Sequence, residues 1–144
     1  MTARAPGPHS AKLIANVAIL TPDRALLVKY GQGHDGDGGW MLPDDLLAEG
    51  EHPDAAAARI LQGHLGMKAR PALAFVDSFT GGDGTWHIVF NYLADLTHGP
   101  PIRPGENVTG TGWFMLSSLP GAEDMAHHGW ATDVLTRIVS ARRK

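Results

Sequence analysis

Four carboxylates in one short stretch and a histidine further along are the side chains most able to do chemistry in this sequence. The carboxylates are Asp44, Asp45, Glu49 and Glu51, and the histidine is His64. Carboxylate oxygens suit hard cations such as magnesium, whereas an imidazole suits zinc or manganese. A histidine can also act as a general base near neutral pH. His64 therefore has two candidate roles, as a metal ligand and as a catalytic base. Its structural alternative is a partly exposed helix residue near the C-terminal end of a helix dipole, which would favour protonation.

Aromatic and glycine-rich segments supply weaker candidates. Trp40 and Trp86 could stack on a ring at a cleft and serve as ligand-binding residues, although for each a place in the core is favoured. The stretch from His34 to Gly38 is similar to part of a calcium loop but lacks the terminal bidentate glutamate. We interpret it as a hairpin loop or the lip of a pocket. His87, His127 and His128 have no metal-ligand spacing.

Hydrophobic runs and turn residues predict the strands that position these side chains. A loop with five glycines follows the second strand at 31–39. Turn chemistry at 21–24 and 81–84 joins two pairs of strands into hairpins. The predicted strands cover residues 13–20, 25–30, 72–80, 85–96 and 111–115.

Two helices complete the prediction. His52-Pro53-Asp54 is typical of a helix start, because proline suits the first helical position and aspartate suits the positive end of the dipole. Gly66 is expected to end this helix as a left-handed cap. Its inward face is expected to carry Ala57, Leu61 and Leu65. A terminal helix is predicted at 130–143. The sequence thus indicates one α/β domain at 11–144 with a mixed sheet, preceded by a flexible arm at 1–10.

Composition excludes several classes of protein. The chain has 144 residues, of which 43% are hydrophobic and 19% charged, so it is globular. A net charge of -3 argues against binding to nucleic acid or to an anionic membrane. Cysteine is absent, which excludes disulfides and thiolate sites. No signal peptide or membrane-spanning run is visible, so a cytoplasmic location is expected.

The stretch from Asp45 to Met67 resembles the Nudix box. The family pattern is Gly, five residues, Glu, seven residues, Arg-Glu, an aliphatic residue, any residue, Glu-Glu, any residue, Gly and an aliphatic residue. The retained positions are Glu51, Arg59, Leu61, Gly66 and Met67. The positions that differ are Asp45 for the first glycine, Ile60 for the glutamate after arginine, and Gly63 and His64 for the paired glutamates. Strands on both sides of the box extend the resemblance over most of the chain, as do Trp113-Phe114 and Leu119-Pro120.

The resemblance implies a Nudix fold, with a mixed sheet between helices, and hydrolysis of nucleoside diphosphates linked to another moiety. In that family, carboxylates of the box hold Mg or Mn ions that bridge the diphosphate and activate water. Residues 60, 63 and 64 share one helix face. Since that face carries no carboxylate here, we expect the metal to be bound weakly or not at all. The retained half implies an ion pair between Glu51 and Arg59 and an inward-facing Leu61.

Substitute ligands are an alternative. The loop and helix of the box lie side by side in this fold, so Asp45, Glu51 and His64 could form a relocated metal site, with Glu51 and His64 as catalytic groups. Glu106 is a further catalytic candidate, because several Nudix enzymes take a base from that region. The favoured interpretation is plainer: Asp44 and Asp45 are solvated turn residues, and Glu106 is a surface carboxylate.

Three functions follow from the resemblance. We favour a module that binds a small molecule, with a nucleotide diphosphate as the candidate ligand, and that has lost most of its hydrolytic activity. The alternatives are an active Nudix pyrophosphohydrolase with substitute ligands and a metal-independent biosynthetic enzyme that uses His64 as a base. A homodimer is expected, because Nudix-like domains are often dimeric and twofold symmetry is the commonest closed arrangement.

Overall fold

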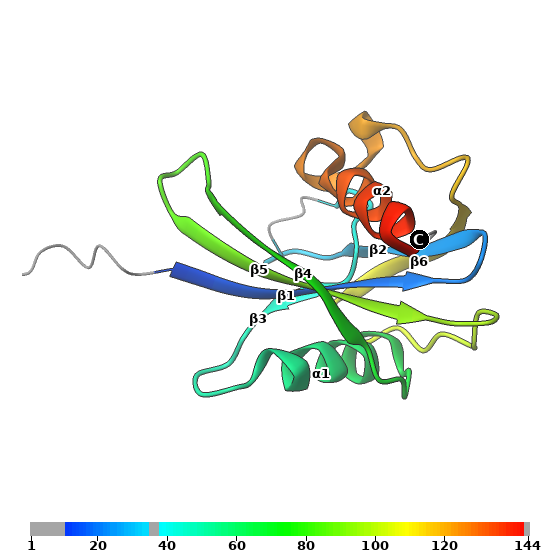
Figure 1. Ribbon diagram of the computed structural model, residues 1–144, viewed down its shortest axis with the longest axis horizontal. Helices are drawn as coiled ribbons and strands as arrows, with labels where there is room; N and C mark the ends of the chain where they lie inside the picture. Colours follow the sequence, from blue (N-terminus) through cyan, green and yellow to red (C-terminus); the bar gives the residue numbers. More distant parts are fainter. Residues whose placement is uncertain (1–10, 35–37, 143–144) are drawn as a thin grey trace, which may run out of the picture.

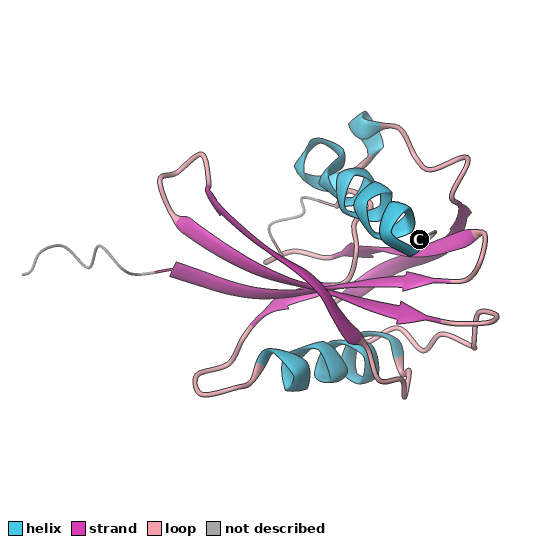
Figure 2. Ribbon diagram, in the orientation of Figure 1, coloured by secondary structure: helices cyan, strands magenta, loops and turns pink. Residues whose placement is uncertain are grey.

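The computed structural model, which describes residues 11–34 and 38–142, places a mixed sheet between two helices (Figures 1 and 2). The strands are β1 (Ala11–Leu20), β2 (Arg24–Tyr30), β3 (Asp44–Leu46), β4 (Ala72–Thr80), β5 (Trp86–Asp95) and β6 (Val108–Met115). The helices are α1 (Pro53–Leu65) and α2 (Trp130–Arg142), and two 3₁₀ turns, η1 (Ala122–Asp124) and η2 (Ala126–Gly129), precede α2. The arm expected at 1–10, and Asp35 to Asp37 of the loop similar to a calcium site, lie outside the described residues.

The sheet order is β4-β5-β1-β2-β6, and β3 pairs with β1 off this path. β1 is parallel to β5, whereas its other pairings are antiparallel. β1 and β2 pair only at one end, where Leu20 lies opposite Ala25, and they diverge from there. The segment from Met41 to Leu46 fills the divergence, because Met41 exchanges backbone hydrogen bonds with Val28 and β3 pairs with β1. This segment carries the start of the box.

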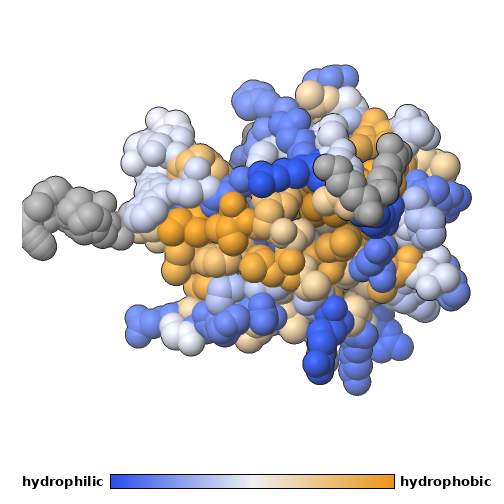
Figure 3. Space-filling model, viewed as in Figure 1, coloured by the Kyte–Doolittle hydropathy of each residue, from blue (hydrophilic) through white to orange (hydrophobic). Residues whose placement is uncertain are grey.

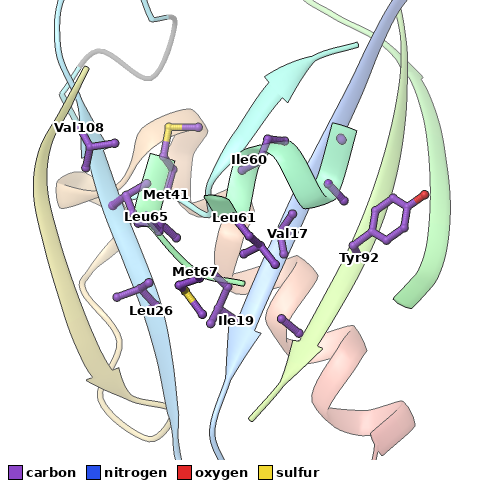
Figure 4. Close-up of a cluster of buried hydrophobic side chains, with 14 of the residues drawn as sticks. Val17, Ile19, Leu26, Met41, Ile60, Leu61, Leu65, Met67, Tyr92 and Val108 are labelled. Carbon is purple, nitrogen blue, oxygen red and sulfur yellow. The ribbon is translucent and has the colours of Figure 1, made fainter. Parts of the chain in front are cut away.

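Side chains alternate across β1 and supply both cores. Ala15, Val17 and Ile19 face α1, whereas Ala18 and Leu20 face α2. Figure 4 shows the α1 side, where the helix packs on β1 and β2. The fully buried helix residues on this side are Ala56, Ala57, Ile60, Leu61 and Leu65.

The ends of α1 agree with the prediction. The His52 side chain accepts a hydrogen bond of 3.0 Å from the backbone N–H of Asp54 and so caps the first turn. Gly66 has φ 66°, and its N–H and that of Met67 donate to the carbonyls of Gln62 and Leu61. The bond from Gly66 to Gln62 is that of an αL cap, as the sequence predicted for this glycine. A Cβ at Gly66 would also lie 2.7 Å from Cβ of Arg103, so only glycine fits there.

Several elements differ from the prediction. β1 begins two residues earlier than expected, and β6 begins at Val108, ahead of the strand predicted at 111–115. Neither β3 nor the 3₁₀ turns were predicted. β3 has only three residues, two of them aspartates, so it carries no hydrophobic alternation that a sequence pattern could detect. Within 11–34 and 38–142, no helix is both long and apolar enough to cross a membrane.

Leu61 provides a direct test of the α1 packing. It is fully buried on the helix face that meets the sheet. Leu61→Ala should lower the free energy of unfolding by about 2–5 kcal/mol, because it removes buried methyl groups and leaves a cavity. Chemical denaturation monitored by circular dichroism measures the change. The neighbouring exposed residue gives the control, since Gln62→Ala should change stability by no more than about 0.5 kcal/mol. Equal effects at both positions would contradict this packing.

Candidate functional site

Arg59 joins the two halves of the box. Its Nε donates to Glu51 at 2.9 Å, its Nη1 donates to Asp45 at 2.8 Å, and its Nη2 donates to the carbonyl of Leu46 at 3.0 Å. The second oxygen of Glu51 accepts from the backbone N–H of Ala48 at 2.9 Å and from Nη2 of Arg59. The ion pair between Glu51 and Arg59 is confirmed, and the guanidinium holds Asp45 as well.

These contacts change the acidity of Glu51. The hydrogen bond from Arg59, followed by the bond from the Ala48 N–H, lowers the pKa of Glu51 to about 2. The pKa of Arg59 is raised by the same pairing, first with Glu51 and then with Asp45. Glu51 stays ionised at neutral pH, and the oxygens of both Glu51 and Asp45 are directed at the guanidinium. This pairing competes with any cation for the same oxygens.

The three positions that bear glutamates in the family differ in their surroundings. Ile60 is fully buried in the core between α1 and the sheet (Figure 4). The expectation that residues 60, 63 and 64 share one face of the helix at the site is therefore wrong for Ile60. Gly63 is exposed, and a Cβ added there would meet no atom within 4 Å. His64 is partly buried, with its side chain 21% exposed.

His64 belongs to a hydrogen-bonded group that the sequence did not suggest. Its Nδ1 lies 2.7 Å from the hydroxyl of Tyr30, which also accepts from the backbone N–H of Asp44 at 3.3 Å. The ring of His34 stacks on Tyr30 with centroids 4.0 Å apart, and its Nε2 lies 2.8 Å from Oδ1 of Asp44. His64 Nε2 faces Oδ2 of Asp45 at 3.7 Å. The end of β2, its following loop, β3 and α1 thus meet through these five side chains.

Burial decides the charge of His64. Desolvation lowers its pKa, and the nearby Asp45 carboxylate opposes this only in part. The helix-dipole interpretation, which favoured a protonated imidazole, is therefore wrong in direction. A neutral ring that accepts the Tyr30 hydroxyl proton at Nδ1 carries its own proton on Nε2, which faces Asp45. In that tautomer, Nδ1 is hydrogen-bonded and Nε2 faces the Asp45 carboxylate at 3.7 Å.

The expected structural role of Asp44 is also corrected. Asp44 is only 8% exposed, lies in β3, and its carboxylate is close to the His34 ring. It is not a solvated turn residue. Asp45 is half-exposed in the same strand. The difference arises because the two aspartates are adjacent in a strand, so their side chains point in opposite directions.

The donor set does not fit a magnesium site of the usual kind. Among residues 11–34 and 38–142, no cluster of three or more histidine, aspartate or glutamate side chains is placed to hold a metal ion. Of the expected ligands, Asp45 and His64 come together, whereas Glu51 is turned toward Arg59. Hard dications need several oxygen ligands. An imidazole and one paired carboxylate do not supply them.

Glu106 lies in a loop that closes the end of α1. The N–H of Gly105 donates to the His64 carbonyl at 2.8 Å, and the N–H of Arg103 donates to the Leu65 carbonyl at 2.8 Å. Gly105 approaches so closely that a Cβ would lie 2.3 Å from the Gly63 carbonyl oxygen. The Glu106 backbone is thus near the box, while its side chain is exposed.

The two candidate tryptophans have different surroundings. Trp40 lines a groove of about 940 Å³ together with Lys29, Phe114 and the 118–128 segment. Lys29 Nζ lies 4.7 Å from the Trp40 ring, whose edge meets Phe114. Trp86 donates its Nε1–H to Ser78 at 2.7 Å on the surface of the sheet and does not line the groove beside Trp40. Trp40 is the better placed for a ligand.

The groove and the His64 group lie on opposite faces of β2. Lys29 lines the groove and Tyr30 binds His64, and consecutive strand residues point to opposite sides. The histidines of η2 line the same groove, although no role was predicted for them. His127 and His128 have φ of 53° and 56°, a left-handed conformation that is costly for residues other than glycine. This turn brings two adjacent imidazoles to one groove, which a regular helix or strand does not do.

The fold is a mixed sheet between two helices, and an ion pair of an arginine and a glutamate joins the loop to the helix. This arrangement is that of the Nudix-type hydrolase fold. The family model described as NUDIX domain matches residues 11–134, and this chain belongs to that family. Members of the family generally use a divalent metal, magnesium or manganese.

Solved structures support the fold. A MutT NUDIX hydrolase from Burkholderia pseudomallei is 25% identical with a TM-score of 0.73, over 90% of this chain and 98% of that chain. A NUDIX hydrolase from Nitrosomonas europaea is 17% identical with a TM-score of 0.76, over 92% and 90% of the two chains. A MutT/nudix family protein from Enterococcus faecalis is 15% identical with a TM-score of 0.78, over 96% and 64%. A comparison with curated proteins gave no match.

The Glu51 pKa predicts how stability depends on pH. The folded-state value of about 2 lies below the ordinary value of 4.5, so the contribution is fully present above 4.5 and is lost as the pH falls toward 2. Wild type should therefore be more stable than Glu51→Gln at pH 6, and the difference should shrink between about pH 5 and pH 2. Urea denaturation of both proteins across this range measures it. A difference that stays constant with pH would contradict the ion pair.

Proposed function

We propose that this chain is a Nudix-fold domain that binds a small molecule, with a nucleotide diphosphate as the candidate ligand, and that its magnesium-dependent hydrolysis is weak or lost. The observation that carries the proposal is the state of the box carboxylates. None stands at positions 60, 63 or 64, and Arg59 pairs with both Asp45 and Glu51. A hydrolytic Nudix site needs these charges to hold its metal beside a phosphate.

The groove beside Trp40 is the proposed ligand site. It offers an aromatic ring for stacking and the ammonium of Lys29 next to it for an anionic group. Hydrogen bonds hold the Trp40 backbone against the 124–126 segment of the groove. The N–H of Trp40 donates to the Asp124 carbonyl at 3.0 Å, and the carbonyl of Trp40 accepts from the Ala126 N–H at 2.9 Å. A Cβ on Gly39 would lie 2.5 Å from the backbone nitrogen of Ala126.

One observation favours a second candidate, an active hydrolase with substitute ligands. His64 Nε2 and Asp45 Oδ2 are 3.7 Å apart and could approach a borderline metal such as manganese or zinc from two sides. Binding there requires the proton on Nε2 to be lost or the tautomer to change, and it must compete with Arg59 for Asp45. The third option, His64 as a metal-free base, faces the Tyr30 hydroxyl at Nδ1.

Turnover and ligand binding separate these functions. The protein is incubated with a panel of nucleoside diphosphate derivatives and magnesium, manganese or zinc, and thermal stability is measured with the same ligands. We expect no turnover with magnesium and an increase in melting temperature with at least one ligand. Trp40→Ala should abolish that increase, whereas Trp86→Ala should leave it unchanged. Rapid hydrolysis at millimolar magnesium contradicts the proposal, and hydrolysis unaffected by a chelator points to metal-free chemistry.

Restored carboxylates should bring back metal binding. Gly63→Glu combined with His64→Glu adds two negative charges where open space exists at position 63, so manganese affinity should rise at least tenfold. Isothermal titration calorimetry measures it. Gln62→Glu is the matched control, since it adds charge to the same exposed helix turn outside these positions.

The buried Ile60 limits this experiment to two positions. Ile60→Glu would place a carboxylate in the apolar core and should destabilise the fold by about 3 kcal/mol or more. A folded double variant with unchanged manganese affinity would show that the missing charges are not what limits metal binding.

A further inference from the structure

A pocket lies beyond the C-terminal end of α1, where two segments far apart in the sequence meet (Figure 1). One wall is the chain that leaves the helix, residues 66–69, and the other is formed by the irregular segment 96–103 between β5 and β6. The cavity has a volume of about 560 Å³. It shares no lining residue with the groove beside Trp40, so the two are separate cavities. We call it the α1-end pocket.

The ionisable side chains of the α1-end pocket are all basic. Lys68 comes from the first wall, and His98 and Arg103 come from the second, whereas no described aspartate or glutamate lines the pocket. All three side chains are exposed, and none forms an ion pair with another described residue. Figure 3 shows hydrophilic side chains gathered over α1 and the chain that follows it, beside a hydrophobic band over β4 and β5. In a chain whose net charge is -3, a cluster of this kind attracts anions.

Helix capping is the structural alternative for these basic side chains. Lysine and arginine often bind the last carbonyl groups of a helix and complement its dipole. In the last turn of α1, however, backbone N–H groups already donate to the carbonyls of Leu61, Gln62, His64 and Leu65. The backbone thus caps the helix by itself, and the side-chain donors of Lys68 and Arg103 remain available for a ligand.

The second wall is irregular but firmly anchored. The N–H of Arg103 donates to the Leu65 carbonyl at 2.8 Å, which joins this wall to the end of α1. Gly99 lies against β6, because a Cβ added there would be 2.7 Å from the ring of Trp113. Three prolines further restrict the backbone, Pro100, Pro101 and Pro104. A segment that is already fixed loses little conformational entropy when it binds a ligand.

We propose that the α1-end pocket binds the phosphate group of a small molecule. The planar fork of Arg103 can donate to two phosphate oxygens at once, and Lys68 adds a positive charge from the opposite wall. The ring of His98 can donate an N–H in either protonation state. Donors from two walls suit the several oxygens of a phosphate better than the two oxygens of a carboxylate.

The size and the remaining lining of the pocket indicate the source of the phosphate group. A phosphate ion alone would fill only part of this cavity, whose volume lies in the range of about 300–1,000 Å³ found for small-molecule sites. Met67, Leu96 and Pro100 add apolar surface beside the basic groups. A phosphate ester with an apolar or ring-bearing body uses both parts of the pocket, whereas free phosphate uses only the basic part. An ester is therefore the expected ligand.

NMR titration of the full-length, ¹⁵N-labelled protein tests the site. The three probes are phenyl phosphate, inorganic phosphate and, at matched ionic strength, sodium chloride. We expect both phosphate compounds to shift amide resonances of residues 66–69 and 96–103, with a dissociation constant of about 1 mM or lower for phenyl phosphate. Sodium chloride should leave these resonances unchanged. Tighter binding of phenyl phosphate identifies an ester as the ligand, and equal affinities identify the free anion.

Variants at exposed positions assign the binding to the basic side chains. Lys68→Gln and Arg103→Gln together should weaken the binding of phenyl phosphate by about tenfold or more, because charge-assisted hydrogen bonds are lost. Lys12→Gln is the matched control for Lys68→Gln, since Lys12 is exposed near the first residue of β1. The pocket lies at the other end of that strand, where the Leu96 N–H donates to the Leu20 carbonyl. This control should bind as wild type does.

The proposal is overturned if neither phosphate compound shifts the amide resonances of the pocket, or if sodium chloride shifts them equally. It is also overturned if Lys12→Gln weakens binding as much as Lys68→Gln, because the effect would then be one of net charge. Trp40→Ala separates this site from the proposed ligand groove and should leave phosphate binding unchanged. Loss of phosphate binding in Trp40→Ala would place the phosphate in the groove and contradict the proposal.

Discussion

The guanidinium of Arg59 is the contact on which the geometry of the box depends. It holds Glu51 before the helix and Asp45 in β3 at the same time, and it donates a further hydrogen bond to the Leu46 carbonyl. A planar fork with several donors can bind a carboxylate in a fixed orientation, which lysine cannot do. Because β3 pairs only with β1, this arginine also fixes where β3 lies relative to α1.

The His64 group explains how the protein tolerates the lost carboxylates. Glutamates at three neighbouring helix positions repel each other unless a cation lies between them. Here Ile60 joins the apolar core, and His64 shares a hydrogen bond with Tyr30. The hydroxyl of Tyr30 in turn accepts from the Asp44 N–H, and the ring is covered by His34. Polar groups that would otherwise be buried without a partner are satisfied within the chain.

Much of the scaffold could be predicted from the sequence, because the signals are local. Proline at the helix start and Gly66 at its end determine α1, and the resemblance to the Nudix box implied the ion pair between Glu51 and Arg59. The partnership of Tyr30 and His64 joins residues far apart in the sequence and leaves no periodic pattern. Only an aromatic residue at the end of a strand, followed by His34 in a glycine-rich loop, hinted at it.

The burial of Ile60 follows from a different limit of sequence reasoning. Positions 60, 63 and 64 lie on one side of a helix, but a helix face spans a wide arc. Residue 60 is next to Leu61 in the sequence and about one helical turn from Ala56, and both of these residues are fully buried. An isoleucine at position 60 therefore packs into the core between α1 and the sheet. A carboxylate at this position would be buried among apolar side chains without a partner, so the isoleucine makes position 60 part of the core.

The separation of the groove from the box bears on which ligands the fold can hold. Lys29 and Tyr30 point to opposite faces of β2, so a ligand stacked on Trp40 does not touch His64. In a metal-dependent site, an anionic ligand approaches carboxylates and needs a cation between them. In the groove, the ammonium of Lys29 lies next to the aromatic ring, and it can meet an anionic group directly. For the ligand proposed above, this attraction would come from a side chain that the fold already supplies, and it would act against the carboxylates of Glu123 and Asp124, which also line the groove.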